Sequence, residues 1–315
     1  MNELFPFRLA PYFRTRIWGF HDLAPWFDYK TDGEPIGEVW LTGEMCKAAT
    51  GAFAGQSLQA ITDQHGQELL GTALGDGEFP LLIKLLFPKE KLSVQVHPDD
   101  AMARKYGAPR GKTECWYALD AQPGAQVALG IREGVTCEEV RAAIKAATLE
   151  DLLEMVPVQK GDMLFVDAGT VHAMGPGVVI LETQQTSDLT YRMYDYGRPR
   201  ELHLEKSLEA MRLKTRAGKV PPQSVNRHSL LIDEKYFEIE RWSLDHGGEF
   251  SSLTASTGGV QMIFVADGAI RVSSHGGDAF SVGRCELAVV PASARGVAIE
   301  VESSATVIRM LPRAV

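Results

Sequence analysis

The chain has 315 residues, of which 45% are hydrophobic and 23% are charged, and its formal net charge is −9. This composition is ordinary for a globular protein, and the length allows two domains or one large β domain. Binding to nucleic acid or to an anionic membrane requires clustered Lys and Arg, so an acidic chain without a basic run is a poor candidate for either. A small anionic substrate needs only a local group of positive charges and is not excluded.

The N-terminal residues and the cysteines favour a protein of the reducing cytoplasm. Residues 1–10 contain Glu3 and prolines where a signal peptide would have a basic region followed by an apolar run. No stretch approaches the roughly 20 apolar residues that cross a bilayer. The cysteines form no Cys-x-x-Cys pair, which argues against a zinc ribbon or a dithiol redox site. We therefore expect a cytoplasmic protein with free cysteines.

Most of the first two thirds of the chain has the pattern of short β-strands separated by Gly, Pro and Asp. The predicted strands are 80–87, 91–97, 163–167, 178–184 and 190–194. Residues 136–155 have a helical pattern instead, because Thr136 and Glu139 have the spacing of a capping box and apolar residues then recur at helical intervals. We predict two short helices there with a break near Ala147, and residues 201–212 are also compatible with a helix.

Residues 214–226 are polar and contain two adjacent prolines, so they are the best candidate for a linker. The β pattern then returns, with predicted strands at 236–244, 261–267, 269–273, 285–290, 296–301 and 306–311. Many short strands with turn signals between them are typical of a jelly roll or barrel in each half. We predict a mainly β protein with an N-terminal domain over residues 1–225 and a smaller C-terminal domain over residues 226–315.

The first segment that indicates chemistry is Leu-Ser-Val-Gln-Val-His-Pro at 92–98. Side chains alternate between the two faces of a strand, so Ser93, Gln95 and His97 share one face and the apolar residues between them share the other. Three polar side chains on an enclosed face require partners, because burying them unpaired is costly. A metal ion with a polar substrate would supply these partners, and so would solvent if the strand face were exposed.

Two further segments contain possible metal ligands. Glu114 lies at the start of an apolar run in GKTECWY at 111–117, and a carboxylate can share one divalent ion with an imidazole from a neighbouring strand. His172 follows a glycine turn in DAGTVHAMGPG at 167–177, which resembles the Pro-Ala-Gly-x-x-His pattern of cupin metal sites. Taken singly, a Glu at a strand start or a lone His is more often structural than functional.

The last informative segment is LETQQTSDLTYRMYDYGR at 181–198, which combines strand character with many polar residues. Arg192 lies on one face of the predicted strand among polar neighbours. It either binds a phosphate or a developing oxyanion, for which its planar guanidinium is well suited, or pairs with Asp188 or Asp195 at the surface.

Together these four segments resemble the type I mannose-6-phosphate isomerases, and most closely their short bacterial form. Two segments near the N-terminus, 16–19 and 35–40, also resemble family segments. The resemblance covers most of residues 1–212 and is only general beyond the linker. No single segment is specific, whereas their ordered combination is highly specific.

The resemblance implies a fold and a metal site. It implies two cupin (jelly-roll) β-barrel domains, with catalysis in the N-terminal one and without the long helical insertion of the larger family members. Two departures, Asp167 for the usual proline and Thr183 for the usual aliphatic residue, fall outside the implied ligands. One zinc ion per chain would be bound by Gln95, His97, Glu114 and His172.

The activity that the resemblance implies is the interconversion of mannose 6-phosphate and fructose 6-phosphate through a cis-enediol, with zinc as a Lewis acid. Arg192 matches the family's active-site arginine, and we expect it to stabilise the oxyanion. Lys112 matches a lysine beside the substrate, where it acts as the base or orients the sugar. Lys84, Ser93 and Asp188 are further candidates for binding the substrate, although a lysine that extends from its strand to solvent explains Lys84 equally well.

Two other functions fit parts of the pattern. Another cupin metalloenzyme, such as an iron-dependent oxygenase, would use two His and one carboxylate, but the Gln ligand and the 190–198 segment argue against it. A non-catalytic sugar-phosphate-binding cupin would have no need of all four ligands together with Arg192. The sequence leaves open whether the chain is a monomer or a dimer, which residue is the general base, and what residues 229–315 do.

Overall fold

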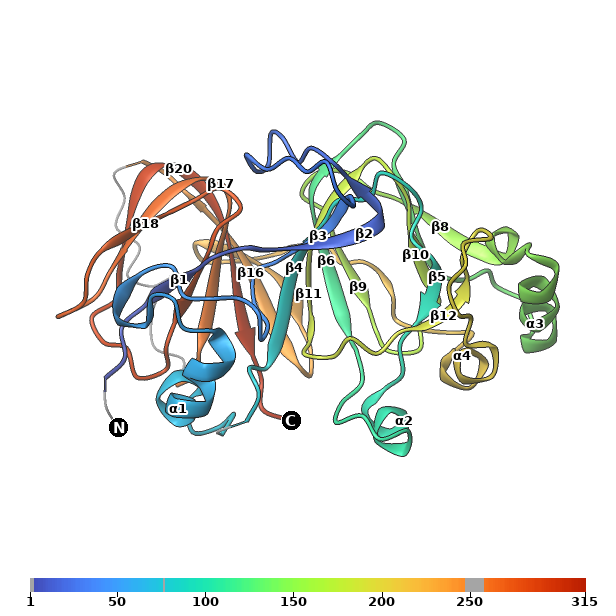
Figure 1. Cartoon of the computed structure of the whole chain (residues 1–315), viewed down its shortest axis with the longest axis horizontal. Helices are drawn as coiled ribbons and strands as arrows, with labels where there is room; N and C mark the ends of the chain where they lie inside the picture. The colour runs from blue at the N-terminus through green and yellow to red at the C-terminus, as the bar shows by residue number, and fades with distance from the viewer. Residues whose placement is uncertain (1–2, 76, 247–257) are drawn as a thin grey trace.

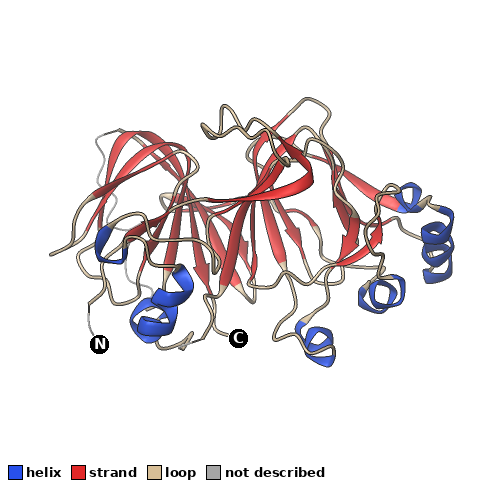
Figure 2. Cartoon of the chain, in the orientation of Figure 1, coloured by secondary structure: helices blue, strands red, loops and turns tan. Residues whose placement is uncertain are grey.

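Strands form the framework of the computed structural model, which describes residues 3–75, 77–246 and 258–315 (Figures 1 and 2). A mainly β protein is therefore confirmed. The N-terminal unit contains a seven-stranded sheet whose spatial order is β13 (Gly218–Lys219), β9 (Met163–Val166), β6 (Glu114–Ala121), β11 (Val178–Gln185), β4 (Leu81–Leu86), β3 (Ile36–Trp40) and β2 (Tyr12–Phe20).

Two further sheets complete the described strands. A five-stranded sheet in the N-terminal unit has the order β12 (Tyr191–Tyr194), β5 (Val94–Val96), β10 (His172–Met174), β7 (Gln126–Ile131) and β8 (Leu153–Pro157). The eight-stranded sheet of the C-terminal unit has the order β1 (Phe7–Leu9), β19 (Leu287–Val290), β17 (Gln261–Ser273), β20 (Ala298–Pro312), β16 (Phe237–Leu244), β15 (His228–Asp233) and β14 (Gln223–Val225), with β18 (Phe280–Gly283) paired to β17.

The helices are short and lie outside the sheets (Figure 2). Those described are α1 (Leu58–Leu70), α2 (Asp100–Lys105), α3 (Cys137–Ala146) and α4 (Leu204–Ala210), with single 3₁₀ turns at η1 (Gly51–Phe53) and η2 (Leu149–Leu152). The longest of them, α1, has 13 residues, in agreement with a chain that lacks a long helical insertion. None of the described helices is long and apolar enough to cross a membrane.

The central strands of the seven-stranded sheet are buried on both faces, and the two faces differ in chemistry. On one face, Ile83 and Leu181 belong to a single apolar core with Phe264 and Ile308 of the C-terminal unit. The opposite face points toward the five-stranded sheet and carries Lys84, Glu114 and Glu182 among its buried residues. Because side chains alternate along each strand, the same strands attach the two units to each other and present polar groups to the space between the N-terminal sheets.

The helical island is partly as predicted. Thr136 Oγ1 accepts a hydrogen bond from the Glu139 amide and Glu139 reaches back to the Thr136 amide, which confirms the capping box. The break at Ala147 is also confirmed, because this residue has a left-handed conformation with φ of 59°. The predicted helix over 153–155 is wrong: these residues begin β8, whose pairing with β7 outweighs local helix propensity.

Other boundaries also differ from the prediction. The pairs of strands predicted at 261–273 and at 296–311 are the single long strands β17 and β20, which pair with each other through several register shifts. The helices α1 and α2 were not predicted, although Ser57 and Asp99 both cap them with a side-chain oxygen. The domain boundary at 225/226 stays a prediction, and β1 pairs with β19 of the C-terminal unit across it.

Candidate metal centre and active site

Strand β5 presents the first part of the site. Val94 and Val96 are buried in an apolar cluster with residues of α3 and α4, so the side chains between them point the other way. Gln95 and Ser93 line a cavity on that side, and His97 lies buried beside it. The alternation expected of a strand thus places the polar residues of LSVQVHP on the enclosed side.

The pairing of β5 with its two neighbours brings in residues that are distant in sequence. His172 on β10 is directly opposite Gln95, and Arg192 on β12 is opposite Gln95 from the other side. The Gln95 amide nitrogen lies 3.3 Å from His172 Nε2. Because the oxygen and nitrogen of an amide are assigned from their surroundings, the oxygen of Gln95 can equally face this point.

Glu114 reaches the same point from the facing sheet. Its carboxylate oxygens lie 3.6 Å from His97 Nε2 and 3.5 Å from His172 Nε2. All three side chains are buried, and their ligand atoms lie within 4.8 Å of one another. Two imidazoles and one carboxylate therefore converge from two sheets on one enclosed point.

Backbone carbonyl groups fix the orientation of both histidines. His97 Nδ1 donates to the Leu189 carbonyl and His172 Nδ1 donates to the Thr170 carbonyl, each at 2.9 Å. These bonds put the lone pair of each ring on Nε2, which faces Glu114, as a metal ligand requires. Burial, followed by the positive charge of Lys112, lowers the pKa of His97 well below its ordinary value. Burial also lowers the pKa of His172, so both rings are neutral at neutral pH.

The donor set fits a divalent metal ion. Within the described part of the chain, the buried Nε2 atom of His97 has no hydrogen-bond partner. An unpaired buried polar atom is costly, and a cation bound between the three side chains would satisfy it. Burial alone would raise the pKa of Glu114, but the nearby charge of Lys112 lowers it, so the carboxylate is available in its anionic form. Nitrogen and oxygen donors of this kind bind zinc and related ions.

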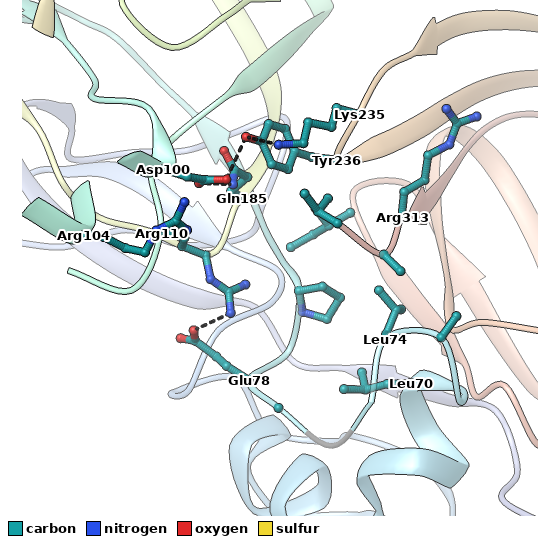
Figure 3. Close-up of a pocket in the computed structure, with 16 residues that line it drawn as sticks. Leu70, Leu74, Glu78, Asp100, Arg104, Arg110, Gln185, Lys235, Tyr236 and Arg313 are labelled. Atoms are coloured by element: carbon teal, nitrogen blue, oxygen red, sulfur yellow. Dashed lines mark hydrogen bonds and ion pairs between the residues drawn. The ribbon is translucent and has the colours of Figure 1, made fainter. Parts of the chain in front are cut away.

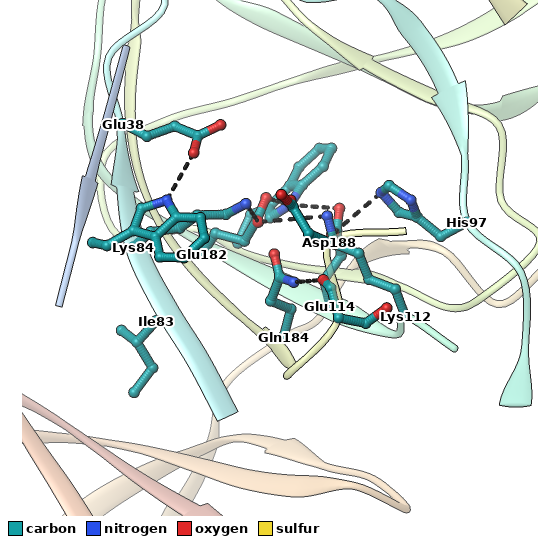
Figure 4. A network of polar contacts seen from close by, with 12 residues as sticks. Glu38, Ile83, Lys84, His97, Lys112, Glu114, Glu182, Gln184 and Asp188 are labelled. Carbon is teal, nitrogen blue, oxygen red and sulfur yellow. Dashed lines mark hydrogen bonds and ion pairs between the residues drawn. The ribbon is translucent and has the colours of Figure 1, made fainter. Parts of the chain in front are cut away.

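A network of buried charges surrounds Glu114 (Figure 4). Lys112 Nζ lies 2.9 Å from Glu114 and 3.8 Å from Glu182, and Lys84 Nζ lies 2.9 Å from Glu182. The indole N–H of Trp116 donates to both carboxylates at 3.1 Å. Burial, together with the charge of Glu114, raises the pKa of Glu182. Lys84 therefore pairs with Glu182 inside the protein and does not extend to solvent.

A cavity of about 360 Å³ opens beside the three converging side chains. It is lined by five basic residues, Arg16, Lys84, Lys112, Arg192 and Arg200, and by three acidic ones, Glu38, Glu182 and Asp188. The excess of positive charge favours an anionic ligand.

Arg192 keeps hydrogen-bonding capacity at the wall of this cavity. Its Nη1 atom donates to the Glu201 carbonyl at 2.8 Å, and its Nε atom is buried without a hydrogen-bond partner among the described residues. The described ion pairs of Asp188 and Asp195 are with Arg14 and with Arg198 and Arg200, so Arg192 forms neither of the surface pairs that its sequence neighbourhood allowed.

The structure brings all nine residues singled out in the sequence to one region. Seven are buried or lie deep in the cavity; Arg192 is half-buried, and the Asp188 side chain is largely exposed at the rim. Sequence reasoning missed Glu182, Arg16 and Arg200. Strand alternation gave a usable signal for Glu182, because it precedes the buried Gln184 by two residues on β11 and shares its face.

Comparisons with known proteins identify relatives of this chain. Residues 6–135 match the family model described as phosphomannose isomerase type I, catalytic domain. A mannose-6-phosphate isomerase of Streptococcus mutans is 36% identical over 253 residues, which cover 76% of this chain and 79% of the relative. The mannose-6-phosphate isomerase ManA of Bacillus subtilis is 37% identical over 258 residues, which cover 76% of this chain and 79% of the relative.

Similarity to a solved structure extends over the whole chain. The crystal structure of the mannose 6-phosphate isomerase from Bacillus subtilis matches with a TM-score of 0.86 at 30% identity. The match covers 98% of this chain and 99% of the other, so the C-terminal unit is included although its sequence pattern was only generally similar.

We expect His172→Ala to abolish tight binding of a divalent metal, because it removes one of two imidazoles from the converging set. Arg192→Ala is the matched comparison: it alters the same cavity without removing a converging side chain and should retain about one metal ion per chain. Elemental analysis of both purified proteins after dialysis measures this. Equal metal content in the two variants would contradict the assignment of His172 as a ligand.

Proposed function

The chain belongs to the type I phosphomannose isomerase family, and we propose that it is a zinc-dependent aldose–ketose isomerase that interconverts mannose 6-phosphate and fructose 6-phosphate through a cis-enediol. The observation that carries the proposal is the convergence of His97, Glu114 and His172 within 4.8 Å at the cavity, in a chain whose relatives bear the name of this activity.

The proposed zinc ligands are Gln95, His97, Glu114 and His172. Two neutral imidazoles, an amide and one carboxylate leave a bound Zn²⁺ with a net positive charge. When bound, zinc would supply Lewis acidity toward the sugar carbonyl and the neighbouring hydroxyl. The same positive charge, added to the basic residues of the cavity, favours a phosphorylated substrate over a neutral sugar.

The reaction moves a proton between C2 and C1, so one group has to accept the proton and return it. We assign this role to Glu182, which lines the cavity and is outside the proposed ligand set. Its Oε1 atom faces Lys84 at 2.9 Å and Lys112 at 3.8 Å. Lys112 lies between two carboxylates, where its ammonium group stabilises negative charge and orients the sugar. Of the two roles expected for Lys112, general base or orienting group, we therefore propose the orienting one.

Arg192 and the remaining lining residues account for binding of the rest of the substrate. The unpaired Nε atom of Arg192 is a charged donor at the cavity wall and is suited to stabilising the enediolate oxygen. Ser93 and Lys84 are proposed to contact the phosphate, with Arg200 as an additional basic residue at the same cavity. Asp188 is proposed to contact a sugar hydroxyl from the rim.

The proposed function is tested by a coupled assay on the zinc-loaded protein, with formation of fructose 6-phosphate from mannose 6-phosphate as the readout. We expect turnover that is lost on chelation and restored by zinc, and no oxygen consumption under the same conditions. Binding of mannose 6-phosphate without turnover would favour a sugar-phosphate-binding protein. Oxygen uptake that depends on iron would favour an oxygenase of the same fold.

Glu182→Gln should reduce kcat by at least about a hundredfold while zinc content stays near one per chain, because an amide cannot accept the proton. Glu205→Gln is the control, since Glu205 is an exposed residue of α4 that pairs with Arg141 on α3. Exchange of the substrate C2 hydrogen with deuterated solvent measures the proton-transfer step directly. Exchange at the wild-type rate in Glu182→Gln would transfer the role to another residue.

A further inference from the structure

A hydrogen-bond network connects the C-terminal unit to the segment that carries Lys112 and Glu114, and Asp100 is at its centre (Figure 3). The hydroxyl group of Tyr236 donates to Asp100 Oδ2 at 2.9 Å. The other carboxylate oxygen, Oδ1, accepts from the Gly111 amide at 2.9 Å and from Gln185 Nε2 at 3.1 Å. Three donors from three distant parts of the chain therefore meet on one carboxylate.

The same network holds each peptide group from 111 to 113. The side-chain oxygen Oε1 of Gln185 accepts from the Thr113 backbone amide at 2.9 Å. The backbone amide of Gln185 donates to the Thr113 carbonyl at 3.1 Å. The Lys112 amide donates to the Pro98 carbonyl at 3.0 Å. Gly111 packs so closely on the backbone before α2 that an added Cβ would lie 2.4 Å from the Asp99 carbonyl carbon. This segment is therefore fixed just before β6 begins at Glu114.

We propose that Tyr236 is a positioning residue for the isomerisation, acting through Asp100 and Gln185 on residues 111–113. The proposal deepens the proposed function, on which its kinetic consequence rests. The Lys112 side chain has to lie between Glu114 and Glu182, and a shift of the backbone at 111–113 would displace it. The C-terminal unit thereby contributes to a site that none of its described side chains lines.

The surroundings of Tyr236 distinguish this role from general stabilisation of the fold. Strand β16, which begins directly after Tyr236, is already anchored by continuous pairing with β20, so the hydroxyl group adds little to the position of that strand. The ring borders a cavity of about 470 Å³ between the two units, where the hydroxyl group reaches Asp100 across the boundary. Burial would raise the pKa of Asp100, but the bonds from Gly111, Gln185 and Tyr236 lower it, so the acceptor is a carboxylate and its bonds are strong.

The test compares Tyr236→Phe with Tyr106→Phe. Tyr106 also donates to a carboxylate, Glu209 at 2.6 Å, at the other end of α2, and this bond does not involve Asp100. With both proteins fully loaded with zinc, we expect Tyr236→Phe to lower kcat about fivefold with KM changed less than about twofold, the scale of one hydrogen bond. Tyr106→Phe should match the wild type in both parameters.

Amide hydrogen exchange supplies a readout that does not depend on turnover. In Tyr236→Phe, the amides of Gly111 and Thr113 should exchange about fivefold faster, while amides of the central strands keep wild-type rates. Asp100→Asn preserves an acceptor for the Gly111 amide, so its exchange rates at Gly111 and Thr113 should lie between those of the wild type and those of Asp100→Ala. Unchanged exchange at 111–113 in Tyr236→Phe, or acceleration spread over the whole chain, would overturn the proposal. Were the wild type to show no isomerase activity, the exchange result would still decide whether Tyr236 holds this segment.

Discussion

The burial of the Glu114 carboxylate is the constraint on which the rest of the site depends. An isolated carboxylate in a protein interior is unstable, so each of its oxygens needs a positive charge or a donor. Lys112 lies 2.9 Å from Oε2, and the indole of Trp116 donates to Oε1 at 3.1 Å. Two neutral histidines face the same carboxylate at 3.5 and 3.6 Å. The two histidine rings and the carboxylate converge on one enclosed point between the two sheets, which is the arrangement that the proposed metal ion requires.

The same local hydrogen-bonding arrangement occurs three times in the part of the chain that the structure describes. A carboxylate and an indole two residues apart share one face of a strand, and the indole N–H donates to the carboxylate in Glu38/Trp40, Glu114/Trp116 and Glu240/Trp242. Arg16 binds the first carboxylate and Arg309 the third, so both charges are neutralised by arginine. The middle pair differs because two histidines face it, and the proposed metal centre lies there, in the N-terminal unit.

Much of the fold and of the candidate site could be predicted from the sequence, and the parts that could not be predicted have physical causes. Alternation along 92–98 placed Gln95 and His97 on one enclosed face, and the capping box at Thr136 located α3. Glu114 and His172 gained most of their support from the family resemblance, since convergence across two sheets depends on strand register that a single segment does not encode. Asp100 and Tyr236 could not be identified, because 136 positions separate the two partners and each looks ordinary in its own segment.

One metal ion is predicted to bind where the two N-terminal sheets meet, and anomalous diffraction from crystals of the protein tests this most directly. Data collected on both sides of the zinc absorption edge identify the element and its position in one experiment. We predict a single strong zinc peak within coordination distance of Gln95, His97, Glu114 and His172, at about 2.0–2.2 Å for the nitrogen and oxygen ligands. A peak located elsewhere, or no zinc peak between His97 and His172 in a catalytically active preparation, would contradict it.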